Sequence, residues 1–368
     1  MNKIRIGTVF SGIGSVEWAL KSRNISHEII FACDNGDIEF HRDIEIDKML
    51  LEVKKLKSIQ EMHEFENKLF IDIKKTNFVK QSYLFNYNLN ENRFHQDVRL
   101  LDGTKYKGQI DLFVGGSPCQ SFSIMGYQKG LDDARGTLFY EYARLVKEIE
   151  PKVFIYENVQ GLLKHDKGNT WEIMSKIFDS LEYEYIPLIL NSKDYGIPQN
   201  RNRLFVVGFK QLKYKNRFRE PEKIELKFTL QDFLIESCKE GSFNYINYKK
   251  DPGIVDEKYY LSEKVLNHVM STGTKNYIVK PKIDLEIARP LLATMHKMHR
   301  AGVDNYVTVN ERIRKLTPRE CLRLMGYGDE FKQCVSDTQM YKQAGNSIVV
   351  QIFENLLNSI INTKVFDE

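Results

Sequence analysis

The sequence is short of the features that mark secreted, membrane-spanning or cysteine-based metalloproteins. It has five cysteines among 368 residues, an odd number with no Cys-x-x-Cys pair, so neither a disulfide framework nor a zinc site is expected. No run approaches the ~18 consecutive apolar residues that a membrane span needs. The first residues enter an apolar strand pattern directly, without a signal-peptide pattern. We therefore expect a cytoplasmic protein with no metal and no membrane partner.

A strong excess of charge of either sign is also missing. Lys and Arg total 54 against 50 Asp and Glu, which gives a net charge of +4. This excess is too small to indicate a polyanionic partner by itself. The 42% hydrophobic and 28% charged residues are typical of a globular chain with one large core and a smaller second one. Any argument for nucleic acid must therefore rest on local motifs.

Apolar runs alternate with helical patterns over the first part of the chain. Strands are predicted over residues 4–10, 28–34, 111–116 and 153–158, and helices are predicted after the first and third of them. This alternation predicts an α/β fold with a doubly wound, mostly parallel sheet of the Rossmann-like type. Ligands bind such sheets at the carboxyl ends of the strands. The residues that follow each strand are therefore the candidates for function.

The remaining segments suggest the domain organisation. An insertion over 38–92 is rich in charged residues and carries apolar residues at helical spacing, which predicts an amphipathic helix with a structural role. We expect a ligand-binding and catalytic domain over 1–209 that contains this insertion. The pattern then changes to short strands and loops, which predicts a second, smaller domain over 210–340. The helical pattern of 341–368 is expected to return to the first domain.

A glycine-bearing turn follows the first strand. In FSGIGS, residues 10–15, Gly12 and Gly14 permit a tight bend and a close approach to a nucleotide. A dinucleotide site would need a third glycine where the chain has Glu17, whose charge is poorly suited to a pyrophosphate. Asp34 ends the next strand, where it can accept hydrogen bonds from a ribose. Together, the glycine turn and Asp34 predict an adenosine-containing cofactor without phosphates. The alternative is a plain tight turn with an exposed acid at the end of a strand.

Three further strand ends carry reactive side chains. Cys119 lies in GGSPCQSFS, residues 115–123, and its position after Ser-Pro in a polar loop favours a nucleophile over a buried, inert thiol. Glu157 ends an apolar strand, where partial burial should raise its pKa and suit it to proton donation. A helix-capping acid is the alternative there. Arg201 and Arg203 are two residues apart in an extended segment, so we expect them to point together.

A basic cluster follows the first domain. It precedes the first acidic residue, Glu220, and is expected to form a local positive patch, with a solvated charge run as the alternative. Its members are Lys210, Lys213, Lys215, Arg217 and Arg219.

In this order, the motifs resemble those of the DNA (cytosine-5)-methyltransferase family. FSGIGS is similar to the first cofactor motif of that family, GGSPCQSFS to its nucleophile loop, ENV to its glutamate motif and QNRNR to its arginine motif. RKLTPRECLRLMGY and YKQAGNSIVV resemble its two closing motifs. The stretch 115–209 is particularly similar to the compact bacterial restriction-modification methylases. The resemblance leaves out 38–92 and 210–310, and Ser15 stands where many members have glycine.

The resemblance implies roles for the catalytic and cofactor-binding residues. Cys119 would add to ring carbon 6 of a cytosine, while protonated Glu157 holds ring nitrogen 3. Arg203, with Arg201 beside it, would bind the cytosine carbonyl oxygen. The methyl group would come from S-adenosylmethionine and leave S-adenosylhomocysteine. Phe10 would stack on the adenine, and Asp97 would bind its exocyclic amine. The eight residues that would line the cofactor pocket are Phe10, Gly12, Gly14, Asp34, Asp97, Pro118, Leu138 and Asn346.

The resemblance also implies double-stranded DNA as the substrate, with the target base flipped out of the helix. A lid over 121–136 would close on that base, with Met125, Lys129 and Arg135 near the DNA. The second domain, above all the segment 288–302, would contact the DNA bases and so recognise the target sequence. The further residues expected to contact DNA are Gln199, Arg289, Thr294, His296, Lys297 and Arg300.

The protein is expected to act in a bacterial or phage-infected cell. It is expected to be a monomer and to recognise a short DNA site of about four to six base pairs. A cognate restriction endonuclease is the implied partner, with a solitary or phage-encoded methylase as the alternative. A tRNA cytosine methyltransferase is disfavoured because its Cys-Phe-Thr signature is missing. A silent DNA-binding relative is disfavoured because Cys119 and Glu157 are both present. Glu17 argues against an NAD-linked oxidoreductase.

Overall fold

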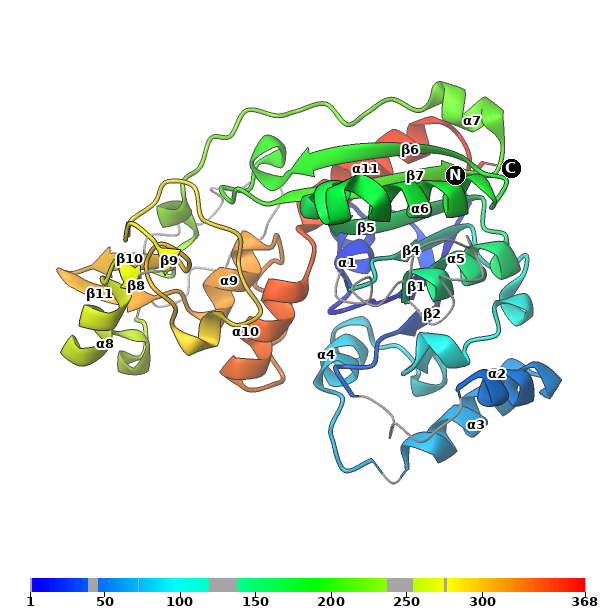
Figure 1. Cartoon of the computed structure of the whole chain (residues 1–368), viewed down its shortest axis with the longest axis horizontal. Helices are drawn as coiled ribbons and strands as arrows, with labels where there is room; N and C mark the ends of the chain where they lie inside the picture. The colour runs from blue at the N-terminus through cyan, green and yellow to red at the C-terminus, as the bar shows by residue number, and fades with distance from the viewer. Residues whose placement is uncertain are drawn as a thin grey trace.

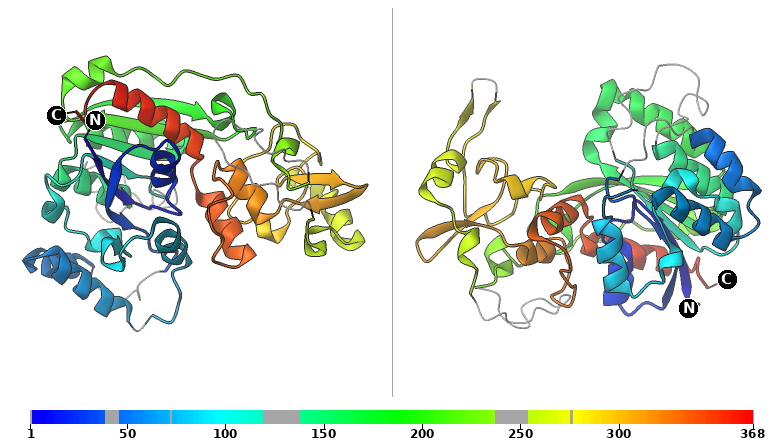
Figure 2. Two further views of the ribbon diagram at one scale, coloured as in Figure 1. Left: turned by 180° about the vertical axis from the view of Figure 1, so that it is seen from behind. Right: turned by 90° about the horizontal axis from the view of Figure 1, so that it is seen from below.

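The structure, a computed structural model, describes residues 2–38, 46–71, 73–118, 138–236, 254–274 and 277–367. These residues form two lobes, a large one around a central sheet and a small one built from short helices and strands (Figures 1 and 2). The expected α/β fold with a mostly parallel sheet is confirmed. Within the described ranges, no helix is both long enough and apolar enough to cross a membrane.

The large lobe contains a seven-stranded sheet in the order β3-β2-β1-β4-β5-β7-β6. The first five strands along the chain are parallel, whereas β7 runs antiparallel between β5 and β6. The order reverses between β1 and β4, which is where α/β sheets form a ligand crevice. The strands are β1 (Ile4–Val9), β2 (His27–Cys33), β3 (Phe94–His95), β4 (Leu112–Gly115), β5 (Val153–Val159), β6 (Glu184–Asn191) and β7 (Asn202–Phe209).

Helices cover both faces of this sheet (Figure 1). One face packs against α1 (Ser15–Ser22) and α11 (Val350–Asn362), and the other against α5 (Leu138–Ile149) and α6 (Asn169–Asp179). Neighbouring residues of β5 alternate between the two cores, with Ile155 in the first and Tyr156 in the second. Since both faces are buried, the central strands read as continuous apolar runs.

The insertion differs from the single amphipathic helix that its spacing predicts. It contains α2 (Ile46–Lys55), α3 (Ile59–Phe70) and α4 (Phe78–Tyr87). The side chains of Ser58 and Asn77 each accept a hydrogen bond from the backbone three residues later and so begin new helices. The prediction of one helix was wrong because the apolar spacing continues across these caps. The Ser-x-x-Glu pattern at 58–61 was the sequence signal for the first break.

The small lobe begins later than the expected boundary at 210. Phe218 still packs against the large lobe, with its ring 5.5 Å from that of Phe209, and the Ile224 amide donates to the Asp194 carbonyl. The remaining helices and strands are α7 (Leu212–Arg217), α8 (Glu263–Val269), β8 (Gly273–Thr274), β9 (Tyr277–Ile278), β10 (Tyr306–Val309), β11 (Arg312–Lys315), α9 (Pro318–Leu324) and α10 (Asp337–Asn346). Short 3-10 segments are Glu91–Arg93, Val98–Leu100, Gly103–Tyr106, Gln160–Gly168, Ser192–Tyr195, Leu230–Phe233, Glu257–Tyr259 and Met295–Lys297.

The basic cluster on and around α7 is not a free positive face. Lys210 forms a 2.7 Å ion pair with Glu150, and Arg217 donates to the carbonyl of Thr363. The helix lies on the large lobe, at the end remote from the small lobe (Figure 1). The cluster is therefore better described by the alternative, a solvated charge run, than as a positive patch that faces DNA.

Candidate active site

A pocket lies at the carboxyl ends of β1, β4 and β5, where the strand order reverses. Its empty volume is about 470 Å³, part of which is open to solvent. The turn after β1, the start of α1, the end of β4 and the turn between α10 and α11 supply its walls. The residues that define its chemistry are Phe10, Gly12, Glu17, Gly116, Glu157 and Asn346.

The turn after β1 has an unusual backbone on the pocket wall. Phe10 has φ 53°, a left-handed conformation that is strained for a bulky residue and typical of functional sites. Gly12 also has φ 53°, and a Cβ at this position would meet no atom within 4 Å. An aromatic ring thus lies beside an open stretch of backbone. This combination can accept a flat heterocycle and the chain attached to it.

The wall of the pocket, as far as the structure describes it, offers no cationic side chain to a phosphate. Its lining residues include Glu17 and Glu157 and, among the described residues, no Lys or Arg. Glu17 is buried, where it accepts hydrogen bonds from the hydroxyls of Thr8 and Tyr83 at 2.8 and 2.6 Å. The residues present thus lack the positive charge that a pyrophosphate would need, and they fit S-adenosylmethionine, whose sulfonium is itself positively charged.

Asp34 and Asp97, expected to bind the adenosine, both hold backbone turns. The carboxylate of Asp34 accepts the amides of Gly12 and Gly36, each at 2.9 Å. Burial raises the pKa of Asp34, and these two amide hydrogen bonds oppose the increase. Asp97 accepts the backbone amide of Arg99 at 3.0 Å and pairs with its guanidinium at 2.5 Å.

Of the eight expected cofactor residues, three line the pocket: Phe10, Gly12 and Asn346. Leu138 begins α5 and packs against the same core as Phe10. Pro118 is exposed at the end of the described segment after β4. Neither of these is among the residues that line the pocket.

Gly14 serves packing, and it does not line the pocket. It has φ 78°, and a Cβ there would lie 2.5 Å from the ring of Tyr87 in α4. The Tyr87 hydroxyl donates to the Gly14 carbonyl oxygen. From the same helix, Ser82 bonds to Gln343 of α10 at 2.8 Å. The last helix of the insertion therefore supports the cofactor turn and ties it to the C-terminal segment.

Ser15, which departs from the family pattern, makes a specific contact. Its hydroxyl is 2.8 Å from the Ser347 hydroxyl and 2.9 Å from that of Tyr327. Both partners lie in the closing motifs, so the serine links the first motif to the last two. Because all three hydroxyls are buried, this network satisfies groups that would otherwise be costly to bury.

Glu157 and Arg203 are brought together by the antiparallel pairing of β5 and β7. Arg203 Nε lies 3.0 Å from Glu157 Oε1. Burial raises the pKa of Glu157, and the positive charges of Arg203 and Arg201 oppose the increase. The structure thus places a carboxyl that holds a proton more readily than usual on the pocket wall, next to a guanidinium.

A buried hydrogen-bond network fixes the segment that leads to Cys119. Asn158 Nδ2 donates to the Ser117 carbonyl oxygen at 3.0 Å and to the Tyr156 hydroxyl at 2.8 Å. The Ser117 hydroxyl is 2.7 Å from the same phenol. Sequence reasoning missed these positioning residues. The only signal was their place directly beside Glu157 and just before Pro-Cys in the sequence.

Four expected site residues lie outside the described residues: Cys119, Met125, Lys129 and Arg135. The expected lid over 121–136 lies there too. The described chain reaches Pro118, one residue before the expected nucleophile, so the base of this segment is defined.

Arg201 lies at the contact between the two lobes, which we call the joint. Arg201 donates to the carbonyl oxygens of Leu291, Gly345 and Ser347 at 2.7–2.9 Å. It therefore does not point with Arg203, and the expectation that the two share one target was wrong. Burial lowers the pKa of this guanidinium.

Gln199, expected to contact DNA, is 0% exposed. Its amide donates to the Leu324 carbonyl oxygen at 2.8 Å and accepts the Leu291 amide at 3.1 Å. The expectation was wrong because a side chain sealed in this way cannot reach a nucleic acid. Gln199 is a second joint residue.

The remaining expected DNA contacts lie in the small lobe, on the segment that begins at this joint. Thr294 and Lys297 are exposed, whereas Arg289, His296 and Arg300 are half-buried. Arg300 donates to the Ser271 hydroxyl at 2.9 Å, which fixes its direction. Thr294 and Lys297 are thus the most accessible of the five.

Gly116 lies so close to Glu157 that a larger residue at this position would disturb the pocket. A Cβ at this position would lie 2.8 Å from both the carbonyl oxygen and Oε2 of Glu157, closer than real contacts allow. We expect Gly116→Ala to displace Glu157 and lower kcat by about 100-fold. Gly161→Ala is the matched control, because a Cβ there meets nothing within 4 Å. Initial rates of the methyl transfer that the resemblance implies measure both variants, and equal rates would contradict the assigned role of this contact.

Comparison with known proteins identifies relatives of the chain. The family model described as C-5 cytosine-specific DNA methylase matches residues 53–362. The orphan methyltransferase M.SPRI of Bacillus phage SPR is 28% identical over 483 aligned positions that cover 100% of both chains. The type II methyltransferase M.HhaI of Haemophilus parahaemolyticus is 35% identical over 250 residues, which cover 68% of this chain and 75% of that one. The crystal structure of S. pombe Dnmt2 methyltransferase matches 99% of both chains with a TM-score of 0.64 and 18% identity, which supports the fold alone.

Proposed function

This chain belongs to the C-5 cytosine-specific DNA methylase family, and we propose that the pocket between β1, β4 and β5 is its active site. The protein is a DNA (cytosine-5)-methyltransferase. The observation that carries the assignment of the site is the position of Glu157, which pairs with Arg203 on the wall of the same pocket that Phe10 and Gly12 line. One pocket can thus hold a cytosine against a methyl donor.

The methyl donor is S-adenosylmethionine, which supplies an electrophilic methyl group when bound. Phe10, Gly12 and Asn346 are proposed to hold it, and Asp34 keeps the turn of Gly12 in place. The described lining of this pocket carries no Lys or Arg, so no positive side chain there opposes the sulfonium of the donor. Asp97, Pro118 and Leu138 are proposed as outer contacts around the adenosine.

The protein side chains are proposed to activate the cytosine ring in two linked steps. The Cys119 thiolate adds to carbon 6, and the electron pair of the double bond moves into the ring. Protonated Glu157 donates its proton to ring nitrogen 3, so no full negative charge accumulates there. Arg203, positioned by Glu157, donates to the carbonyl oxygen of the base. Carbon 5 then takes the methyl group, loses its proton to a base, and Cys119 leaves by elimination.

Arg201 and Gln199 are proposed to act indirectly, as the joint that holds the small lobe. The small lobe is proposed to read a short duplex site through Thr294, Lys297 and their neighbours. We propose that the enzyme works as a monomer in the cytoplasm of a bacterium or phage-infected cell. Protection of host DNA beside a restriction endonuclease is the first candidate, in line with type II relatives such as M.HhaI. A solitary phage enzyme is the second, favoured by the full-length match to the orphan methyltransferase M.SPRI.

One experiment tests the activity, the nucleophile and the target together. A randomised duplex library is incubated with the full chain and S-adenosylmethionine, with Cys119→Ala in parallel, and then sequenced after bisulfite treatment. We expect protected cytosines in one repeated context with the wild type and none with the variant. No protected cytosine in any duplex context would overturn the proposal and direct the search to tRNA.

A further inference from the structure

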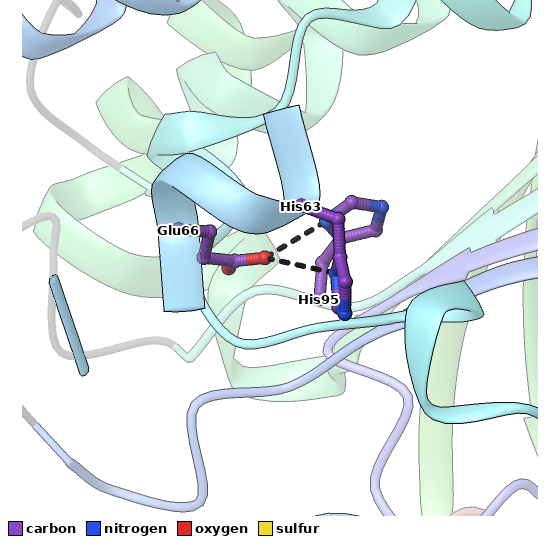
Figure 3. Close-up of side chains that lie close together, drawn as sticks. All are labelled: His63, Glu66 and His95. Atoms are coloured by element: carbon purple, nitrogen blue, oxygen red, sulfur yellow. Dashed lines mark hydrogen bonds and ion pairs between the residues drawn. The ribbon is translucent and has the colours of Figure 1, made fainter. Parts of the chain in front are cut away.

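A cluster of three buried side chains lies outside the active-site pocket. His63 and Glu66 come from α3 of the insertion and His95 from β3 at the sheet edge (Figure 3). His95 Nδ1 lies 2.9 Å and His63 Nδ1 lies 3.9 Å from Glu66 Oε2. The three candidate ligand atoms all lie within 4.8 Å of one another. None of these residues lines the pocket.

One atom of this cluster has no partner. His63 is only 6% exposed, and its Nδ1 makes no hydrogen bond. Burying a polar nitrogen without a partner is unfavourable, so such atoms call for an explanation. Burial, together with the neighbouring His95, lowers the pKa of His63. A buried nitrogen without a hydrogen-bond partner is one that a metal ion could coordinate.

The atoms around the cluster already hold the candidate ligands in place. Glu66 Oε1 accepts the backbone amides of Gln96 and Asp97 at 2.6 and 2.8 Å, which leaves Oε2 directed toward the histidines. His95 Nε2 lies 2.8 Å from the Tyr106 hydroxyl. Hydrogen bonds of this kind to the far atoms of histidine and carboxylate ligands are typical of metal sites, where they fix ligand orientation.

We propose that His63, Glu66 and His95 form a zinc-binding site that fastens the insertion to the sheet. Two imidazoles and one carboxylate are ligands that Zn²⁺ accepts, and water can supply the fourth position. Ligand atoms about 2.0–2.2 Å from a tetrahedral zinc lie roughly 3.3–3.6 Å apart. The distances of 2.9 and 3.9 Å from Glu66 Oε2 to the two histidines lie on either side of this range. The two histidine nitrogens lie within 4.8 Å of each other, so the imidazoles must move together as the metal binds.

The protons balance on binding. If His95 Nδ1 carries the proton that faces Glu66, that proton moves to solvent, while Nε2 takes one up and donates to the Tyr106 oxygen. His95 stays neutral, and Glu66 turns its freed oxygen to the metal. The expectation of no metal rested on the spacing of the cysteines. That spacing carries no information on a site whose ligands are His63 and Glu66, three residues apart on a helix, and His95 on a distant strand.

Metal binding by the full chain tests the site without reference to methylation. The protein is treated with a chelator, dialysed, and titrated with Zn²⁺ or with Co²⁺ as a spectroscopic probe. We expect one equivalent to bind, an increase of the Tm with Zn²⁺, and a cobalt spectrum without thiolate charge-transfer absorption. No binding would overturn the proposal, and so would a thiolate band, which would indicate a cysteine site instead.

Two variants locate the bound metal. His63→Phe keeps a ring beside His95 but removes the nitrogen, so zinc affinity should fall by about 100-fold or more while the metal-free Tm is maintained. His268→Gln, an exposed histidine on α8, is the matched control and should bind zinc like the wild type. Glu66→Gln keeps an oxygen for the two backbone amides and should also lose zinc. Wild-type affinity in both site variants would overturn the proposal.

Discussion

Cys119→Ser is expected to abolish turnover, with a loss of about 10⁴-fold or more in kcat, while DNA binding stays near the wild-type level. The reason is chemical: a serine hydroxyl is far less acidic than a thiol and gives no comparable nucleophile to add to carbon 6. Transfer of labelled methyl groups to duplex DNA measures the first quantity, and a gel-shift titration measures the second.

The matched control is Cys334→Ser, because Cys334 is a free cysteine of the described chain that does not line the pocket. Its Sγ donates a weak hydrogen bond to the Ser82 hydroxyl at 3.8 Å. It should methylate at the wild-type rate. Appreciable methylation by Cys119→Ser would remove the covalent step from the mechanism, and loss of activity in both variants would point to general damage by thiol substitution.

Glu157→Gln is expected to lower kcat by on the order of 100-fold or more, the usual scale for the loss of an acid catalyst. The amide keeps the size of the side chain and an oxygen for Arg203 Nε, which lies 3.0 Å away in the wild type. It cannot deliver a proton to ring nitrogen 3. Single-turnover methylation rates over a range of pH measure the effect.

The pH profile separates this role from a structural one. Because burial raises the pKa of Glu157, its protonated form persists to a higher pH than an ordinary glutamic acid allows. Activity that depends on this form declines as the pH rises through the raised pKa, and Glu157→Gln should lack that decline. Glu354→Gln is the control, since burial also raises the pKa of Glu354 on α11. An unchanged rate in Glu157→Gln would exclude Glu157 as the acid.

The parallel core of the fold was predictable because its strands are buried on both faces. β4 and β5 read as continuous apolar runs, and their ends mark the pocket. β6 was missed because as an edge strand it mixes exposed and buried positions and contains Pro187. β3, with two residues, is too short to give any pattern. Strand length and exposure therefore set the limit of the prediction.

The site was predictable where a residue acts locally and not where its partners are distant. Phe10 and Gly12 lie in the turn after β1, and Glu157 lies near the carboxyl end of β5, so their place in the pocket could be inferred. Arg201 was expected to act beside Arg203, and Gln199 was expected to contact DNA. Their partners are main-chain atoms about 90 to 150 residues further along the chain, which no local pattern reveals.

The joint between the lobes has a consequence for how such enzymes can diversify. Arg201 and Gln199 grip the small lobe through backbone atoms of Leu291 and Leu324, and those atoms are the same whatever side chains the positions carry. Substitutions on the exposed face of this segment leave the attachment unaltered. The proposed recognition surface of the small lobe can therefore change its side chains, and with them its target, without a change in its attachment to the catalytic lobe.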